Sequence, residues 1–105
     1  MAIDLRTRIP EPLKLLEVIS KYGEIRGRVA LHRIVYIAQS RGTNLGYRFL
    51  NYSFGPYSKE LDYDLQLLKR LGLVAIEEEN GECLIKLTGK GAEVVKGLRS
   101  IKRGV

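Results

Sequence analysis

The chain contains one cysteine and one histidine in 105 residues, and it has no tryptophan. A single cysteine cannot close an intramolecular disulfide, so we expect a protein of a reducing compartment, the cytoplasm. His32 and Cys83 lie far apart in sequence, and neither has a paired base, nucleophile or metal ligand at a suitable spacing. We therefore predict no enzyme activity, no catalytic residues, no metal site and no cofactor. Cys83 lies in an apolar run, which favours a packed strand residue over a reactive thiol.

Long apolar runs are also missing. Residues 1–10 alternate charged and aliphatic side chains, unlike the continuous apolar core of a signal peptide, and no later stretch is long enough to span a bilayer. We expect no membrane association. The 45% of hydrophobic residues suffices for one modest core. Residues 1–105 are therefore predicted to form a single domain, with its core over about 10–88 and a C-terminal helix over about 89–103.

Charge is unevenly distributed. The formal net charge of +6 favours a polyanionic partner, because each Lys or Arg placed against a phosphate releases condensed counterions. Residues 60–82 hold seven acidic residues against Lys69 and Arg70, so the chain is basic at both ends and acidic in between. Asn, Gln, Cys and Met are scarce beside many Lys, Arg, Glu, Ile and Val, a composition typical of proteins from thermophiles.

Apolar residues recur at helical spacing in four stretches. The first lies between Pro12 and Gly23, and the second, over residues 28–41, is apolar around much of its circumference. In the third, Pro56 presets the first turn, Ser58 caps the helix, and leucines recur every three or four residues until residue 72. The fourth follows Gly89.

Two strands are predicted between the third and fourth helices. Leu73–Glu79 and Glu82–Leu87 flank Asn80 and Gly81, a pair that suits the left-handed dihedral angles of a type I′ turn. This pattern predicts a two-stranded β-hairpin. Residues 24–27 are too few for more than a strand stub or a turn, and residues 43–55 are predicted to be an ordered, aromatic-rich connection.

Three helices, a hairpin and a final helix make an α+β fold in the order of a winged helix-turn-helix. Residues 27–39 and 54–74, which include Gly55-Pro56-Tyr57-Ser58, resemble a prokaryotic, archaeal-type winged-helix family that shares this Gly-Pro-Tyr-Ser signature with Panacea-type antitoxin-like domains. The step at Leu87, Thr88 and Gly91 is similar to the exit from the wing in many prokaryotic winged-helix regulators. The resemblance covers roughly residues 22–95, and it implies transcription regulation or antitoxin-like binding.

The third helix carries a polar stripe opposite its leucines. Spacings of four, three and four residues place Lys59, Tyr63, Gln66 and Arg70 on one face, where they could contact phosphates and read a base edge. The same stripe could also be an ordinary solvated helix face. We predict a transcriptional regulator that binds double-stranded DNA, with a binding set of Arg28, Arg33, Arg48, Ser58, Lys59, Tyr63, Gln66 and Arg70.

Acidic residues keep a second hypothesis open. Glu60, Asp62 and Asp64 on the third helix would meet phosphates or be desolvated without partners. The predicted wing has carboxylates where such hairpins usually carry Lys or Arg: Glu77, Glu78, Glu79 and Glu82. The alternative is a winged-helix accessory subunit of a DNA replication or transcription complex, which docks on a basic protein partner through these glutamates and the third helix.

The final helix also has two interpretations. It could be a strut that covers the hairpin, or it could form a homodimer through Val94, Leu98 and Ile101. A dimer would match the two-fold symmetry of typical operators.

Overall fold

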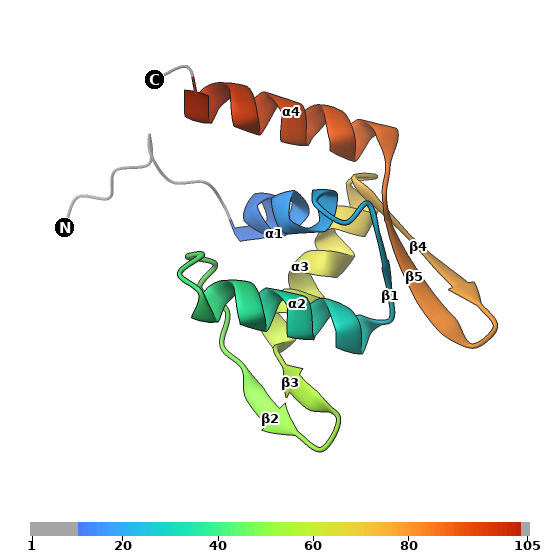
Figure 1. Ribbon diagram of the computed structural model, residues 1–105. Helices are drawn as coiled ribbons and strands as arrows, with labels where there is room; N and C mark the ends of the chain where they lie inside the picture. The colour runs from blue at the N-terminus through green and yellow to red at the C-terminus, as the bar shows by residue number, and fades with distance from the viewer. Residues whose placement is uncertain (1–10, 104–105) are drawn as a thin grey trace.

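A computed structural model describes the backbone of residues 11–103 and the side chains of residues 12–100. Helices and a small antiparallel sheet share one hydrophobic core, so the predicted α+β class is confirmed (Figure 1). In chain order the elements are α1 (Glu11–Ser20), β1 (Glu24–Arg26), α2 (Arg28–Ser40), β2 (Leu50–Tyr52), β3 (Gly55–Tyr57), α3 (Lys59–Arg70), β4 (Val74–Glu79), β5 (Glu82–Leu87) and α4 (Gly89–Arg103).

The first three helices enclose the core. Apolar residues at spacings of three and four place one face of each helix inward, and the leucines of α3 at positions 61, 65 and 68 are all fully buried. α1 packs against α3, and α2 contacts β1 and β3. Burying side chains of this size stabilises the fold by about 1.5–3 kcal/mol each relative to exposure.

The main sheet is antiparallel, with the order β1-β5-β4. The predicted hairpin is confirmed, since Val74 lies opposite Leu87 and Glu79 opposite Glu82. Asn80 and Gly81 at its tip have φ values of 54° and 75°, as a type I′ turn requires. The stub expected at residues 24–27 is a third strand, because β1 pairs with β5 and buries Ile25 opposite Ile85.

A second hairpin occupies the segment expected to be a connection. β2 and β3 pair with Leu50 opposite Tyr57 and Tyr52 opposite Gly55. Pro56 therefore lies in β3 and not in the first turn of α3, which corrects that expectation. In Figure 1 this hairpin projects below α2, well apart from the β4–β5 hairpin.

α4 lies along α1 and covers one end of the fold (Figure 1). Thr88 prepares its start, because its hydroxyl accepts a 3.0 Å hydrogen bond from the N–H of Gly91 and donates one of 2.6 Å to the carbonyl of Gly72. Leu98 is buried and Val94 packs against the core, so the chain itself uses both residues. α4 thus packs mainly on α1, whereas the strut interpretation had it cover the β4–β5 hairpin. The side chain of Ile101 lies outside the described residues, and the dimer stays a prediction.

None of the helices described over residues 11–103 is both long enough and apolar enough to cross a membrane.

Candidate nucleic-acid interface

The outer face of α3 is open to solvent. Lys59, Tyr63 and Arg70 are exposed, Gln66 is half-buried, and Tyr63 reaches 67% exposure, the highest of the large hydrophobic side chains that the structure exposes. The stripe expected from sequence spacing is thus present as a surface. Ser58 is separate from it, because its side chain is 1% exposed and its hydroxyl accepts the N–H of Leu61 as the helix N-cap.

The carboxylates of α3 do not lie on that stripe as unpaired charges. Asp62 accepts a 2.8 Å hydrogen bond from the Tyr57 hydroxyl, and Asp64 accepts one of 2.7 Å from the Tyr47 hydroxyl. Glu60 accepts the Ser58 hydroxyl at 3.0 Å. The pKa of Glu60 is lowered, mainly by a hydrogen bond from the backbone N–H of Glu60 itself and next by the bond from the Ser58 hydroxyl. Asp62 and Asp64 therefore have internal hydrogen-bond partners, whereas Glu60 is exposed and keeps its negative charge beside Lys59.

A buried histidine links α2 to the start of α3. His32 has no exposed surface, and its ring stacks on Tyr57 with centroids 4.2 Å apart. Its Nδ1 accepts the backbone N–H of Ser58 at 3.0 Å, and its Nε2 lies 4.0 Å from Oδ1 of Asp62. Nε2 of His32 and Oδ1 of Asp62 have no hydrogen-bond partner among the described residues. Burial lowers the pKa of His32, so the ring is neutral near pH 7.

Three of the predicted arginines gather around this cluster. Nη1 of Arg28 lies 3.9 Å from Oδ2 of Asp62. Nη2 of Arg33 lies beside Gly55, and it would be 3.6 Å from the Cβ of an alanine at that position. Arg48 shares the lining of a shallow surface pocket with Lys59. Arg70 lies at the opposite end of α3, so a ligand that uses the whole set must follow the length of the helix.

The β4–β5 hairpin carries less unpaired negative charge than its sequence suggests. Oε1 of Glu77 lies 3.1 Å from Nζ of Lys86, and Oε1 of Glu82 lies 3.4 Å from Nη1 of Arg26. Glu78 and Glu79 are exposed beside the turn. Two of the four glutamates thus have cationic neighbours, and the other two form the acidic tip.

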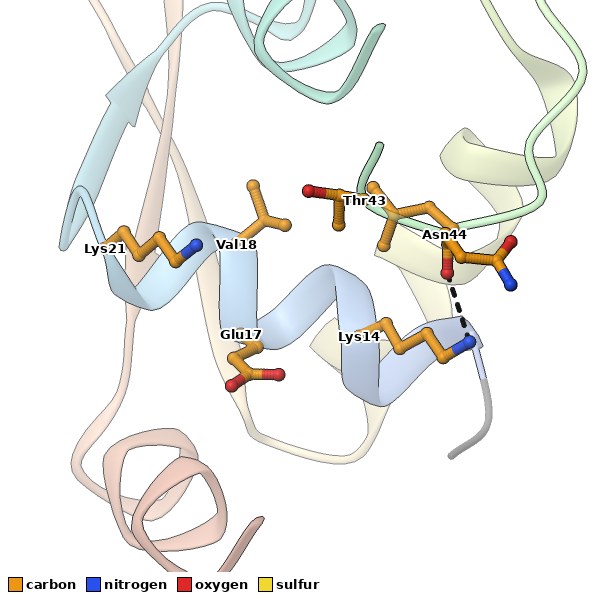
Figure 2. Close-up of a pocket in the computed structure, with 7 residues that line it drawn as sticks. Lys14, Glu17, Val18, Lys21, Thr43 and Asn44 are labelled. Atoms are coloured by element: carbon orange, nitrogen blue, oxygen red, sulfur yellow. Dashed lines mark hydrogen bonds between the residues drawn. The ribbon is translucent and has the colours of Figure 1, made fainter. Parts of the chain in front are cut away.

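A separate pocket of about 410 Å³ lies between α1 and the loop after α2 (Figure 2). Nζ of Lys14 donates a 3.1 Å hydrogen bond to the carbonyl of Asn44 across it. None of the residues predicted to bind DNA lines this pocket. It is therefore no part of the candidate interface, and no group of three or more metal-ligating side chains occurs within the described part of the chain.

Sequence reasoning missed two features of this region. It treated His32 only as a lone histidine, and it did not identify the aromatic hairpin that carries Tyr52 and Phe54. The alternation of Leu50, Tyr52 and Phe54 was the available signal for a strand, but Gly55 and Pro56 directly after it obscured the pairing.

Comparison with known proteins gives one informative similarity. The chain is 34% identical over 74 residues to the uncharacterized protein YwgA of Bacillus subtilis (strain 168), and these residues make up 70% of the chain and 45% of YwgA. The chain thus spans less than half the length of that relative. No family model matches the chain. No solved structure matches it either.

Proposed function

We propose that this protein is a winged-helix protein that binds double-stranded DNA through α3, as a transcriptional regulator. The observation that carries the proposal is the distribution of charge around α3. Asp62 and Asp64 are held by the hydroxyls of Tyr57 and Tyr47, while Lys59, Tyr63 and Arg70 are exposed on the outer stripe. Glu60 is the one carboxylate of α3 that is exposed. Lys59 and Arg70 would bind phosphates, and the Gln66 amide could pair with an adenine edge.

The topology supports the same proposal. α2 and α3 would form the helix-turn-helix, β4–β5 the wing, and β1 the short strand that completes the sheet. The connection between the two helices departs from the usual three- or four-residue turn. It spans residues 41–58 and contains the β2–β3 hairpin, so this chain would bring an additional element beside the DNA.

The second candidate is a protein-docking role for the acidic wing tip. Glu78 and Glu79 are exposed, and carboxylates at this position would attract a basic partner and repel a phosphate backbone. This role would make the protein an accessory subunit of a replication or transcription complex. In the docking role the wing tip contacts a basic protein, whereas in the DNA-binding role it lies near or away from a phosphate backbone.

The test is a titration of labelled duplex DNA from a random pool with the full chain, at several salt concentrations between about 50 and 200 mM. The Lys59→Ala/Arg70→Ala variant should bind more weakly, and its salt slope should be flatter by about one unit for each phosphate that the variant no longer binds. A Lys21→Ala/Lys96→Ala variant removes the same charge from exposed positions in the turn after α1 and on α4, and it should retain the wild-type slope.

Two results would overturn the proposal. One is an absence of duplex binding at the lowest salt concentration. The other is an equal loss of affinity in the α3 variant and in the control, which would mean that total charge, and not α3, determines the interaction. The first result would favour the protein-docking role.

A further inference from the structure

The β2–β3 hairpin presents a pair of parallel aromatic rings to solvent. The rings of Tyr52 and Phe54 have centroids 5.3 Å apart and planes inclined by 2°, and each side chain is 47% exposed. Leu50, which shares β2 with Tyr52, is 58% exposed. Side chains of this size normally contribute to a core, so their position on a projecting hairpin indicates a surface that contacts something else.

The hairpin is held firmly in place. Tyr57 meets both exposed rings edge-on, with centroids 6.1 Å away, and stacks on the buried ring of His32 from its own position in β3. Its hydroxyl bonds to Asp62 of α3. An isolated two-stranded hairpin is marginal in water, but this one is tied to α2 and α3. The exposed ring pair is therefore a preorganised surface, which reduces the entropy lost on binding.

The surroundings of the ring pair are basic. From Ile25 to Lys59 the sequence has no Asp or Glu, and its six cationic residues are Arg26, Arg28, Arg33, Arg41, Arg48 and Lys59. Arg48 and Lys59 line a pocket of about 240 Å³ with Leu50, Tyr52, Tyr57 and Glu60. The guanidinium of Arg33 lies beside Gly55, the residue that follows Phe54 in the chain. Flat apolar rings and cations thus occur side by side.

We propose that the β2–β3 hairpin binds single-stranded DNA, with a base stacked on the Tyr52–Phe54 pair and phosphates bound by Arg33, Arg48 and Lys59. Aromatic rings set among cations suit a polymer whose repeating unit combines a planar base with a phosphate. Duplex DNA does not offer this fit, because its base faces are covered by their neighbours. An acidic peptide would satisfy the cations but has no planar group in each unit to extend the ring stack.

This site is distinct from the outer face of α3, of which it includes only Lys59, although Arg33 and Arg48 also belong to the predicted duplex-binding set. The inference therefore does not depend on duplex binding. Variants on the two surfaces separate the two hypotheses: Gln66→Ala/Arg70→Ala should weaken binding to duplex DNA and leave single-strand binding unchanged.

The experiment is fluorescence anisotropy with a labelled oligothymidylate of about 16 nucleotides, a length within the range of known single-strand sites. The Tyr52→Ala and Phe54→Ala variants should each lose about 5- to 150-fold in affinity, the range expected for one stacked base. Tyr52→Phe should bind like the wild type, because it keeps the ring. Tyr22→Ala is the matched control, since Tyr22 is a similarly exposed tyrosine at the end of α1.

Several outcomes would overturn the inference. One is an absence of oligothymidylate binding at about 50 mM salt. Another is wild-type affinity in alanine variants whose circular dichroism shows an intact fold. A third is equal competition by polyglutamate and by unlabelled oligothymidylate, which would mean that charge alone determines the binding. Tighter binding of oligouridylate than of oligothymidylate would make RNA the preferred ligand.

Discussion

The backbone N–H of Ser58 donates a 3.0 Å hydrogen bond to Nδ1 of His32, and this bond joins the N-cap of α3 to the middle of α2. Because Nδ1 is an acceptor, the proton of the neutral ring is on Nε2, which faces Asp62. A second proton on the ring would have to go to Nδ1 and would break the bond. The start of α3 thus depends on a histidine that stays neutral.

The stability of the protein should fall on acidification between pH 7 and 5. Burial lowers the pKa of His32 from an unperturbed value of 6.5, so the unfolded chain binds the proton more readily than the folded one. The contribution of the neutral His32 to stability is complete above about pH 6.5 and is lost as the pH falls below that value. The free energy of unfolding should change by at most about 1.4 kcal/mol per pH unit. Urea denaturation at a series of pH values measures this slope.

His32→Gln supplies the control for that experiment. Glutamine offers an oxygen acceptor for the Ser58 N–H, does not titrate, and replaces the only histidine in the chain. Its unfolding free energy should change much less between pH 7 and 5. Identical slopes in the two proteins would show that other groups cause the pH dependence.

Tyr57→Phe should destabilise the fold by about 1–3 kcal/mol, the cost of removing a hydrogen-bond donor from a partly buried carboxylate. The Asp62 side chain is 23% exposed and accepts the Tyr57 hydroxyl at 2.8 Å, so the variant leaves this charge less well satisfied. Tyr63→Phe removes a hydroxyl at an exposed position of α3, the helix that carries Asp62, and should change stability by less than about 0.5 kcal/mol. Chemical denaturation compares the two, and equal effects would contradict the importance of the bond.

Alanine substitutions at two glycines of α4 should have opposite effects. A Cβ at Gly91 would press against the carbonyl oxygen of Leu73 and lie 2.9 Å from Cδ1 of Leu87, so Gly91→Ala should cost about 1–3 kcal/mol or more. Nothing lies within 4 Å of a Cβ at Gly97, so Gly97→Ala should stabilise the helix by up to about 1 kcal/mol. Thermal unfolding measures both. A rise or a fall in Tm for both variants would refute this account of how α4 packs.

Reversing a charge at the tip of the β4–β5 hairpin should strengthen duplex binding if the tip only repels phosphates. Glu79→Lys places a cation beside the turn and should steepen the salt slope by about 0.9 for each additional phosphate bound. Glu93→Lys makes the same change at an exposed position on α4 and should have a smaller effect. Unchanged duplex affinity in Glu79→Lys would place the tip away from the DNA, as the docking role requires.

Local sequence patterns determined much of the secondary structure. The leucine spacing of α3, the cap at Ser58 and the Asn80-Gly81 turn each depend on residues a few positions apart, and all three are present in the structure. Such features follow from backbone geometry and short-range hydrogen bonds, so no knowledge of distant segments is needed to predict them.

Only the tertiary structure decided which of these elements pair with one another and which of their side chains come into contact. β1 is a strand because β5 lies beside it, and Tyr57 and Asp62 form one cluster with His32, which is 25 or more positions earlier in the chain. Whether Asp64 faces a phosphate or the Tyr47 hydroxyl depends on what packs beside α3, which helical spacing does not encode. The sequence therefore determined the helices and the turn, whereas contacts between distant segments decided which charges of α3 are exposed.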